Sequence, residues 1–259
     1  MARIAVVTGA NRGIGEAIAR ELAARGLHVI ATSREGRLER TRGPEQDKAA
    51  AEPFQLDVTR PETIEALAER LSAGGFDVLV NNAGVALEGF NAEVARSTID
   101  ANFHGAMRTT DRLLPLMRAG GRVVMVSSGL GELACLSPAL RERFEDPGLD
   151  RDALVSLVES FVRDVAVGTH ANSGWPSSAY RVSKVGMNAF VRVLTRELAS
   201  DARRILVNAA NPGWVRTRMG GSSAPCSPED GARTPVWLAL LPDGGPTGGF
   251  FREECRVAW

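Results

Sequence analysis

The sequence of 259 residues predicts an α/β fold in which helices cover both faces of a doubly wound parallel sheet. Three observations predict it. Short apolar segments alternate along the chain with amphipathic helical patterns. The segments are apolar at successive positions, which is typical of strands that are buried on both faces. A glycine-rich turn joins the first segment to the first helical pattern. The chain length suits a single domain of this class, spanning residues 1–259.

The first half of the chain supplies four strands and two helices. RIAVVTG is the first strand, and the helical pattern after it ends at Gly26. LHVIAT and EPFQLDVT are the second and third strands, separated by a polar stretch, 36–52, that we expect to be a surface excursion. A helix opened by Pro61 follows, and FDVLVNNAG is the fourth strand. That helix has apolar residues at helical spacing on its buried side, namely Ile64, Leu67, Ala68 and Leu71.

The second half supplies three more strands and a helical insertion. GRVVMVSSG, RILVNAANPG and GGFFRE bring the total to about seven strands. The insertion, residues 129–174, interrupts the alternation with two amphipathic helices. Ser137 and Pro138 are typical of a helix start. The second inserted helix carries an apolar stripe made of Leu154, Leu157, Val158, Phe161, Val162 and Val165. We expect this insertion to serve packing more than chemistry.

Composition argues against several kinds of partner. The 31 acidic and 31 basic residues cancel, so no basic face for nucleic acid is expected. No apolar run approaches the length that spans a membrane, and the N-terminal IAVV is too short for a signal peptide. Cys135, Cys226 and Cys255 are widely separated, and no His/Cys spacing resembles a metal site. We therefore expect three reduced thiols, no metal and a cytoplasmic location.

The glycine-rich turn, in TGANRGIGEAIA, indicates a Rossmann-like nucleotide site. Gly9, Gly13 and Gly15 lie between the first strand and the first helix, at the edge where doubly wound sheets bind ligands. Glycine lets the backbone approach a pyrophosphate, and the helix N-terminus favours negative charge. A tight turn that needs glycine for its conformation alone is the plain alternative. The position after a first strand and before a helix favours the nucleotide site.

A second motif, SSAYRVSK, contains the sole tyrosine, Tyr180, and one of only two lysines, Lys184. On a helix the two side chains share a face, so they could simply be neighbours. Free tyrosine has a pKa of about 10, and a nearby ammonium favours the phenolate and lowers that pKa. Lysine is also a compact donor that can reach a ligand's hydroxyl groups. The pair carries chemistry only if a nucleotide site and a substrate pocket lie beside it.

The order of the motifs resembles the short-chain dehydrogenase/reductase family over the whole chain. The turn has the spacing Thr-Gly-x-x-x-Gly-x-Gly, and Asp57 in LDVT, NNAG at 81–84, Asn102 and the second serine of VSS, Ser128, follow it. Tyr180 and Lys184 come next, and then NPGWVRT at 211–217. The long insertion, GWPSSAY, PGWVRT and the ending RVAW resemble the carbonyl-reductase-like branch. Ala209-Ala210 departs from it, because some relatives carry cysteines there; we expect no effect on the chemistry.

The resemblance implies roles for four residues. Lys184 binds the nicotinamide ribose and keeps Tyr180 acidic, and Tyr180 gives a proton to a carbonyl oxygen while hydride reaches the carbon. Ser128 donates to the same oxygen. Asn102 holds a water that passes protons to Lys184. The alternatives are a strand-end cap for Ser128 and a helix-bending hydrogen bonder for Asn102. The implied cofactor-binding residues are Gly9, Asn11, Arg12, Gly13, Ile14, Gly15, Arg34, Asp57, Val58, Asn82, Ala83, Gly84, Tyr180, Lys184, Pro212, Gly213, Val215 and Thr217.

Charge at the end of the second strand favours NADP(H) over NAD. An acid there would accept the adenosine ribose 2′-hydroxyl of NAD, but Ser33 occupies its place. Arg34 follows, and Arg12 lies in the glycine turn. Two guanidinium groups suit a phosphate. Glu35 lies about 20 residues past Gly15, where the general fingerprint seeks an acid, but we judge it one or two positions too late to face the ribose. The alternative for Arg34 is a solvated loop residue.

The predicted pocket is apolar. Trp214 follows the sixth strand, and Met219 with the Gly-Ser-rich loop after it should form a partly mobile lid. Trp175 is a weaker candidate wall, with core packing the equal alternative. The expected function is NADPH-dependent reduction of a small hydrophobic ketone, aldehyde or quinone. The alternatives are an NAD(P)-dependent alcohol dehydrogenase working in oxidation and a non-catalytic nucleotide-binding sensor. The intact Ser128, Tyr180 and Lys184 count against the sensor.

The sequence also predicts a monomer. Many family members associate through the long helices that carry the asparagine and the tyrosine-lysine pair, here expected at about 92–118 and 178–200. The apolar stripe of the insertion needs a partner surface, and the free surface of those helices is the nearest one. An inserted helix would therefore replace an intermolecular contact. The rival is that the stripe is itself a dimer interface.

Overall fold

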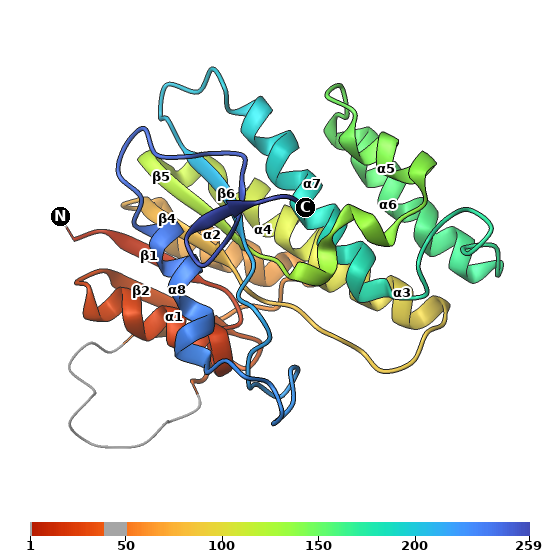
Figure 1. Ribbon diagram of the computed structural model, residues 1–259. Coiled ribbons are helices and arrows are strands. Elements are labelled where there is room, and N and C mark those ends of the chain that lie inside the picture. Colours follow the sequence, from red (N-terminus) through yellow and green to blue (C-terminus); the bar gives the residue numbers. More distant parts are fainter. Residues whose placement is uncertain (1, 39–50) are drawn as a thin grey trace.

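The computed structural model of the protein, which describes residues 2–38 and 51–259, contains one eight-stranded sheet with the order β3-β2-β1-β4-β5-β6-β7-β8 (Figure 1). Strands β1 to β7 are parallel, and β8 is antiparallel to β7. The strands are β1 Ile4–Val7, β2 His28–Ser33, β3 Glu52–Gln55, β4 Phe76–Asn81, β5 Met117–Val126, β6 Leu206–Ala210, β7 Phe250–Arg252 and β8 Cys255–Val257. The seven predicted strands are confirmed, and the eighth was not predicted. Most of the expected excursion at 36–52, residues 39–50, lies outside the described residues.

Helices cover both faces of the sheet. On one face lie α1 (Gly13–Ala24) and α8 (Pro228–Ala239); on the other lie α2 (Pro61–Ser72), α4 (Gly105–Leu113) and α7 (Ala179–Glu197) (Figure 1). Successive residues of each strand face opposite layers: Val78 and Val80 pack with α1 and α8, and Leu79 packs on the other side. The chain order reverses between β1 and β4, so the switch point at which such folds bind ligands lies beside the glycine turn.

The helix expected at 92–118 is divided into pieces. It consists of α3 (Ala92–Ile99), a five-residue π-helical turn at Asp100–His104, α4, and a short 3₁₀ turn at Leu114–Leu116. Strand β5 begins at Met117, before the expected end of the helix. The π-turn carries Asn102, and such turns occur frequently at functional sites.

The insertion forms two main helices, α5 (Pro138–Glu145) and α6 (Arg151–Ala166), as predicted. The Ser137 hydroxyl accepts a hydrogen bond from Leu140 N at 3.4 Å, which confirms the predicted N-cap. Helix α6 lies against α3 and α7 (Figure 1). Four residues of its stripe are buried, Leu154, Leu157, Val158 and Phe161, and Val162 and Val165 are half-buried against the same core.

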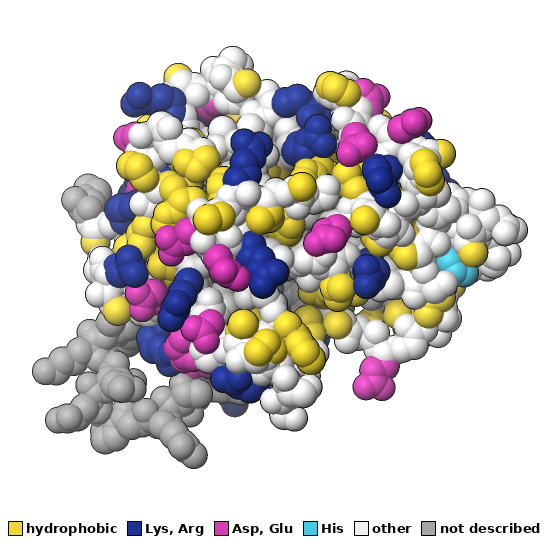
Figure 2. All heavy atoms as spheres, in the orientation of Figure 1, with side chains coloured by type: hydrophobic (Ala, Val, Ile, Leu, Met, Phe, Trp, Pro, Cys, Tyr) yellow, Lys and Arg dark blue, Asp and Glu magenta, His cyan; other side chains and the backbone are white. Residues whose placement is uncertain are grey.

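The surface carries mixed charge. Basic and acidic side chains are interspersed on the face shown in Figure 2, as the equal numbers of the two kinds suggest. In the described parts of the chain, no helix is both long and apolar enough to cross a membrane.

Candidate active site

The glycine turn is held in a conformation that other residues adopt with strain. Gly9 and Gly13 have φ of 62° and 59°, and a Cβ atom on Gly9 would lie 2.9 Å from Ala83 Cα. A Cβ on Gly15 would overlap the Asn82 amide and the Gly9 carbonyl. These glycines let the end of β1 and the start of α1 pack directly on the NNAG segment. The turn thereby presents backbone, rather than side chains, at the switch point.

Hydrogen bonds of Asn82 hold the glycine turn against the NNAG segment. Its Nδ2 donates to Thr8 O at 2.9 Å and to Gly9 O at 3.0 Å. In return, the Thr8 hydroxyl accepts from Asn82 N and Ala83 N, both at 2.9 Å. The predicted cofactor residue Asn82 therefore uses its side chain to hold the glycine turn. Sequence reasoning did not single out Thr8; the Thr-Gly pair that opens the motif was the available signal.

The loop after β6 lies over the same turn. A Cβ atom on Gly13 would lie 3.2 Å from the Thr217 methyl group. Asn211 Oδ1 accepts from Gly213 N at 3.0 Å, which fixes the bend after Pro212. The predicted cofactor residues lie at or just after the ends of β1, β2, β3, β4 and β6, apart from Tyr180 and Lys184 on α7. Among them are Asn11, Arg12, Ile14, Val58, Gly84, Pro212 and Val215.

The end of β2 has no acid in the expected ribose position. Ser33 is buried, and its hydroxyl donates to Arg37 O at 2.8 Å and accepts from Arg37 N at 3.0 Å. Ala10 N donates to Thr32 O at 2.7 Å and so holds the glycine turn beside this strand end. Arg34 and Glu35 are exposed.

Asp57, after β3, is half-buried and forms a local turn. Its Oδ1 accepts from Thr59 N at 3.0 Å and from the Thr59 hydroxyl at 2.7 Å. These bonds keep the predicted adenine-side carboxylate in a defined place at the sheet edge.

The structure brings Ser128, Tyr180 and Lys184 together. Helix α7 starts after the N-cap Ser178 and carries the last two on one face. The Lys184 ammonium is buried, donates to Val126 O at 2.9 Å and lies 5.6 Å from the centroid of the Tyr180 ring. Ser128 follows β5, and its hydroxyl oxygen accepts from Leu130 N at 3.1 Å. Ser128 is thus a turn cap that also lies within reach of Tyr180.

Burial controls the charge states of this cluster. Burial raises the pKa of Tyr180, and hydrogen bonding with the Ser128 hydroxyl only partly opposes it. Burial also lowers the pKa of Lys184 from 10.5 to about 8. In the protein alone the net shift of the Tyr180 pKa is therefore upward, because desolvation of the phenolate is its largest cause. That Lys184 keeps Tyr180 acidic stays a prediction. At neutral pH Tyr180 holds its proton.

Asn102 acts as a bridge between two segments. Its Nδ2 donates to Val85 O at 2.9 Å and to the Ser183 hydroxyl at 3.0 Å, and its Oδ1 accepts from Val85 N at 2.7 Å. The Ser183 hydroxyl donates onward to Tyr180 O at 2.7 Å. These contacts favour the hydrogen-bonding alternative for the Asn102 side chain; the water-holding role stays a prediction. Ser183, inside the Tyr-x-x-x-Lys motif, was not predicted.

Four large apolar side chains are exposed on segments that follow strands of the sheet. Trp214 and Met219 are 56% and 51% exposed, and Leu87 and Leu130 are 45% exposed each. They belong to the segments that follow β6, β4 and β5. The indole Nε1 of Trp214 donates to Gly220 O at 2.8 Å, which fixes the orientation of the ring. The mobility expected for the loop that begins at Met219 stays a prediction.

Trp175 lies elsewhere. It is buried, and its ring contacts Phe161 and Phe144 edge-on, with centroids 5.6 and 6.1 Å away. Its Nε1 donates to Asp164 Oδ2 at 3.1 Å. The structure therefore places it in the core shared with the insertion, which is the packing alternative.

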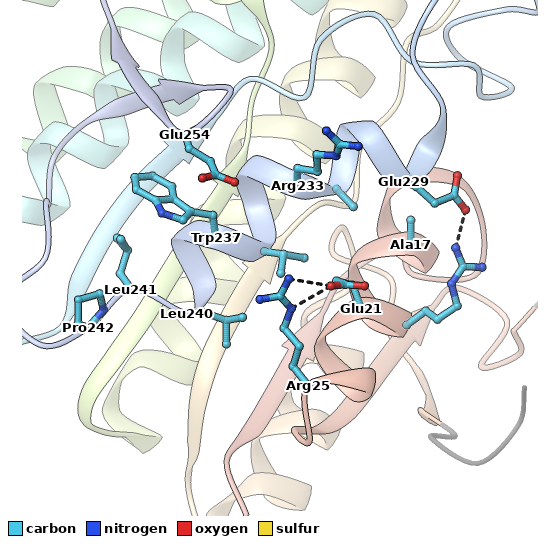
Figure 3. Close-up of a pocket in the computed structure, with 13 residues that line it drawn as sticks. Ala17, Glu21, Arg25, Glu229, Arg233, Trp237, Leu240, Leu241, Pro242 and Glu254 are labelled. Atoms are coloured by element: carbon cyan, nitrogen blue, oxygen red, sulfur yellow. Dashed lines mark hydrogen bonds and ion pairs between the residues drawn. The ribbon is translucent and has the colours of Figure 1, made fainter.

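A separate pocket of about 660 Å³ lies between α1 and α8 (Figure 3). Two ion pairs, Arg20–Glu229 and Arg25–Glu21, lie among the residues that line it. Neither the glycine turn nor the tyrosine-lysine pair lines it, so it is not the predicted site. Within residues 2–38 and 51–259, no group of three or more His, Cys, Asp or Glu side chains is placed to hold a metal ion.

Comparison with known proteins agrees with this geometry. The family model described as short chain dehydrogenase matches residues 3–137 and 165–226. Carbonyl reductase [NADPH] 1 of Rattus norvegicus is 42% identical over 276 residues, which cover 99% of this chain and 98% of the relative. The Homo sapiens protein of the same name is 41% identical, with the same coverage.

Two solved reductases share the fold. Salutaridine reductase from Papaver somniferum has a TM-score of 0.85 at 29% identity, with 97% of this chain and 99% of that chain covered. Menthone neomenthol reductase from Mentha piperita has a TM-score of 0.79 at the same identity and coverage. On its motifs, its sheet order and these matches, the chain belongs to the short-chain dehydrogenase family.

Proposed function

We propose that the protein is an NADPH-dependent reductase that converts the carbonyl group of a small hydrophobic ketone, aldehyde or quinone to the alcohol. The observation that carries this proposal is the cluster of Ser128, Tyr180 and Lys184 at the same sheet edge as the glycine turn. The names of the similar curated proteins, carbonyl reductase [NADPH] 1, support the same activity.

The residues present fit a dinucleotide. Gly9, Gly13 and Gly15 put no side chains at the start of α1, where backbone N–H groups and the helix N-terminus suit a pyrophosphate. Ser33 and the exposed Arg34 suit an adenosine 2′-phosphate, because no carboxylate at the end of β2 repels it. The Lys184 ammonium donates to Val126 O at 2.9 Å and, more weakly, to the Met187 sulfur at 3.9 Å, which leaves donor capacity for ribose hydroxyls. When bound, NADPH supplies the hydride.

The protein's own groups supply the proton and orient the carbonyl. Tyr180 is protonated at neutral pH and donates from its hydroxyl to the substrate oxygen. The Ser128 oxygen accepts from Leu130 N, so its own proton remains for the same substrate oxygen. A tyrosine that keeps its proton suits reduction better than oxidation, since oxidation needs a base at this position.

The proposed substrate class rests on the exposed apolar side chains of the segments that follow β4, β5 and β6. Leu87, Leu130, Trp214 and Met219 expose apolar surface there. Such a surface favours a hydrophobic carbonyl compound over a phosphorylated sugar.

The test is a cofactor-oxidation screen with quinones, aromatic ketones, monoterpenoid ketones and aldehydes, using NADPH and NADH in parallel. We expect oxidation of NADPH with at least one hydrophobic carbonyl. Tyr180→Phe should lower turnover by about 100-fold or more, the typical contribution of a general acid, with NADPH affinity almost unchanged. Near-normal reduction by this variant would contradict the role of Tyr180. Activity confined to phosphorylated sugars, or to alcohol oxidation with NAD, would overturn the proposal.

We further propose that the chain is a single-domain monomer in the cytoplasm. The support for the monomer is that α6 buries Leu154, Leu157 and Phe161 against α3 and α7, where a partner subunit would otherwise pack. The support for the location is that Cys135, Cys226 and Cys255 are free thiols.

A further inference from the structure

Helix α7 carries a third polar residue on the face that holds Tyr180 and Lys184. Asn188 lies four residues past Lys184, and residues at this spacing are neighbours on one helix face. Its side chain is only 2% exposed. Its position in the sequence gave no reason to select it, and the roles of Ser128, Tyr180 and Lys184 do not use it.

Asn188 uses only the nitrogen of its amide in hydrogen bonds among the described residues. Its Nδ2 donates to Gly131 O at 3.2 Å, but its Oδ1 has no hydrogen-bond partner among the described residues. An unsatisfied buried oxygen costs more free energy than one neutral hydrogen bond contributes. An apolar side chain of the same size would remove both that oxygen and the bond to Gly131, so we expect little change in the stability of the fold. The bond to Gly131 is then the contact of the amide that bears on the turn at 128–131.

Gly131 closes the turn that begins at Ser128. Gly131 N donates to Ser128 O at 3.0 Å, and Leu130 N donates to the Ser128 hydroxyl at 3.1 Å. The turn lies directly on α7, since a Cβ atom on Gly131 would be 2.7 Å from Lys184 Cβ and 2.8 Å from its carbonyl carbon. These bonds make residues 128–131 one compact unit, so a bond that holds its last residue also places its first.

We propose that Asn188 is a positioning residue: its bond to Gly131 O seats the turn at 128–131 on α7 and thereby places the Ser128 hydroxyl against Tyr180. The inference rests on the proposed function, in which both groups act on one carbonyl oxygen. It goes further in assigning the alignment of the serine to a residue that contacts neither substrate nor cofactor.

The first test needs no substrate. Tyr180 is the sole tyrosine, so the absorbance change on ionisation reports its pKa alone. The Ser128 hydroxyl lowers that pKa, against the larger effect of burial. Asn188→Leu removes the bond at nearly constant volume. We expect a higher Tyr180 pKa in the ligand-free variant, an unchanged or higher Tm, and an NADPH Kd within about twofold of wild type by fluorescence titration.

The second test measures turnover. Asn188→Leu should lower kcat about tenfold, less than the loss of a whole oxyanion donor, because Ser128 is displaced but still present. The alkaline limb of the pH profile should move to higher pH, since a higher Tyr180 pKa keeps the acid protonated longer. Gly131→Ala should give the same changes by pushing the turn off Lys184. In the double variant, kcat should fall by less than the product of the two fold-losses that the single variants show.

A control on the same helix is Thr195→Val. Thr195 donates to Val191 O at 2.7 Å within α7, and its loss should leave the tyrosine titration and kcat unchanged. An Asn188→Leu variant with wild-type titration would overturn the inference, even if the protein reduces no carbonyl. So would a variant in which Tm and cofactor affinity fall together with kcat. Absence of NADPH-dependent reduction in wild type would instead contradict the proposed function, and the titration would still decide the role of Asn188.

Discussion

Replacement of Lys184 by methionine should make the ligand-free protein more stable. The ammonium is fully enclosed, and burial lowers its pKa from 10.5 to about 8. Each pKa unit corresponds to about 1.4 kcal/mol, so keeping this group charged inside the fold costs about 3 kcal/mol near neutral pH. Methionine removes that cost and keeps most of the volume. It also loses the charged hydrogen bond to Val126 O, worth about 1.5–3 kcal/mol. The expected net gain for Lys184→Met is therefore small, about 0–2 kcal/mol.

The stability gained by Lys184→Met should decrease as pH rises. Below about pH 8 the lysine is protonated in both the folded and the unfolded states, and the full cost of burying the charge is present. Between pH 8 and 10.5 the unfolded chain binds more protons than the folded protein, so wild-type stability rises with pH. Above 10.5 both states are neutral and the cost is gone. The advantage of Lys184→Met is therefore largest near pH 7 and shrinks as pH rises.

Urea unfolding of wild type and Lys184→Met without cofactor, at about pH 7 and about pH 9.5, measures the difference in their free energies of unfolding. Arg25→Met is a control, because Arg25 forms an exposed ion pair with Glu21, and exposed pairs contribute only about 0–1 kcal/mol. A Lys184→Met variant that is less stable than wild type at both pH values would refute the reasoning. So would a stability difference that does not change between them. Loss of turnover is expected in either case, because the lysine is proposed to bind the cofactor.

Two further predictions concern the cofactor and the assembly. Arg34→Asp should weaken NADPH binding by about tenfold or more, the loss expected for a charged hydrogen bond, and should raise the relative use of NADH; a wild type that binds NADH more tightly than NADPH would show that Ser33 and Arg34 are misassigned. Light scattering at micromolar concentration should give a mass near 27.6 kDa; a stable species of twice that mass would refute the monomer.

The sequence predicted β1, β2, β4, β5 and β6 because each contains a continuous apolar run next to a turn signal, whereas β3, Glu52–Gln55, is short and half-buried to exposed. Strand β8 lacks both features. Its three residues, Cys255–Val257, are exposed or half-buried. The turn before it uses Glu253 and Glu254 at φ of 51° and 63°, where glycine or asparagine is the usual signal. An edge strand of this kind has no periodicity to detect.

The interruption of the helix at 100–104 was missed for a different reason. Its cause is Asn102, whose partners Val85 and Ser183 come from segments 17 and 81 residues away. Local pattern carries no information about such bonds. In the same way, the spacing of Tyr180 and Lys184 predicted their proximity but not their burial, and burial decides the direction of both pKa changes. The motifs predicted the reacting groups; the residues that hold them depend on tertiary contacts.

Helix α7 is held on three sides, and this links the insertion to the catalytic cluster. Asn188 contacts the turn at 128–131, Ser183 contacts Asn102, and Gly186 faces Phe103 and Val158. A Cβ atom on Gly186 would lie 3.0 Å from both of those side chains, so α6 and the π-turn approach α7 as closely as packing allows. Proton transfer depends on placement within a fraction of an ångström. A shift of α6 would therefore move the helix that carries Tyr180. By this argument the inserted helix α6 fixes the back of the helix that carries Tyr180 and Lys184.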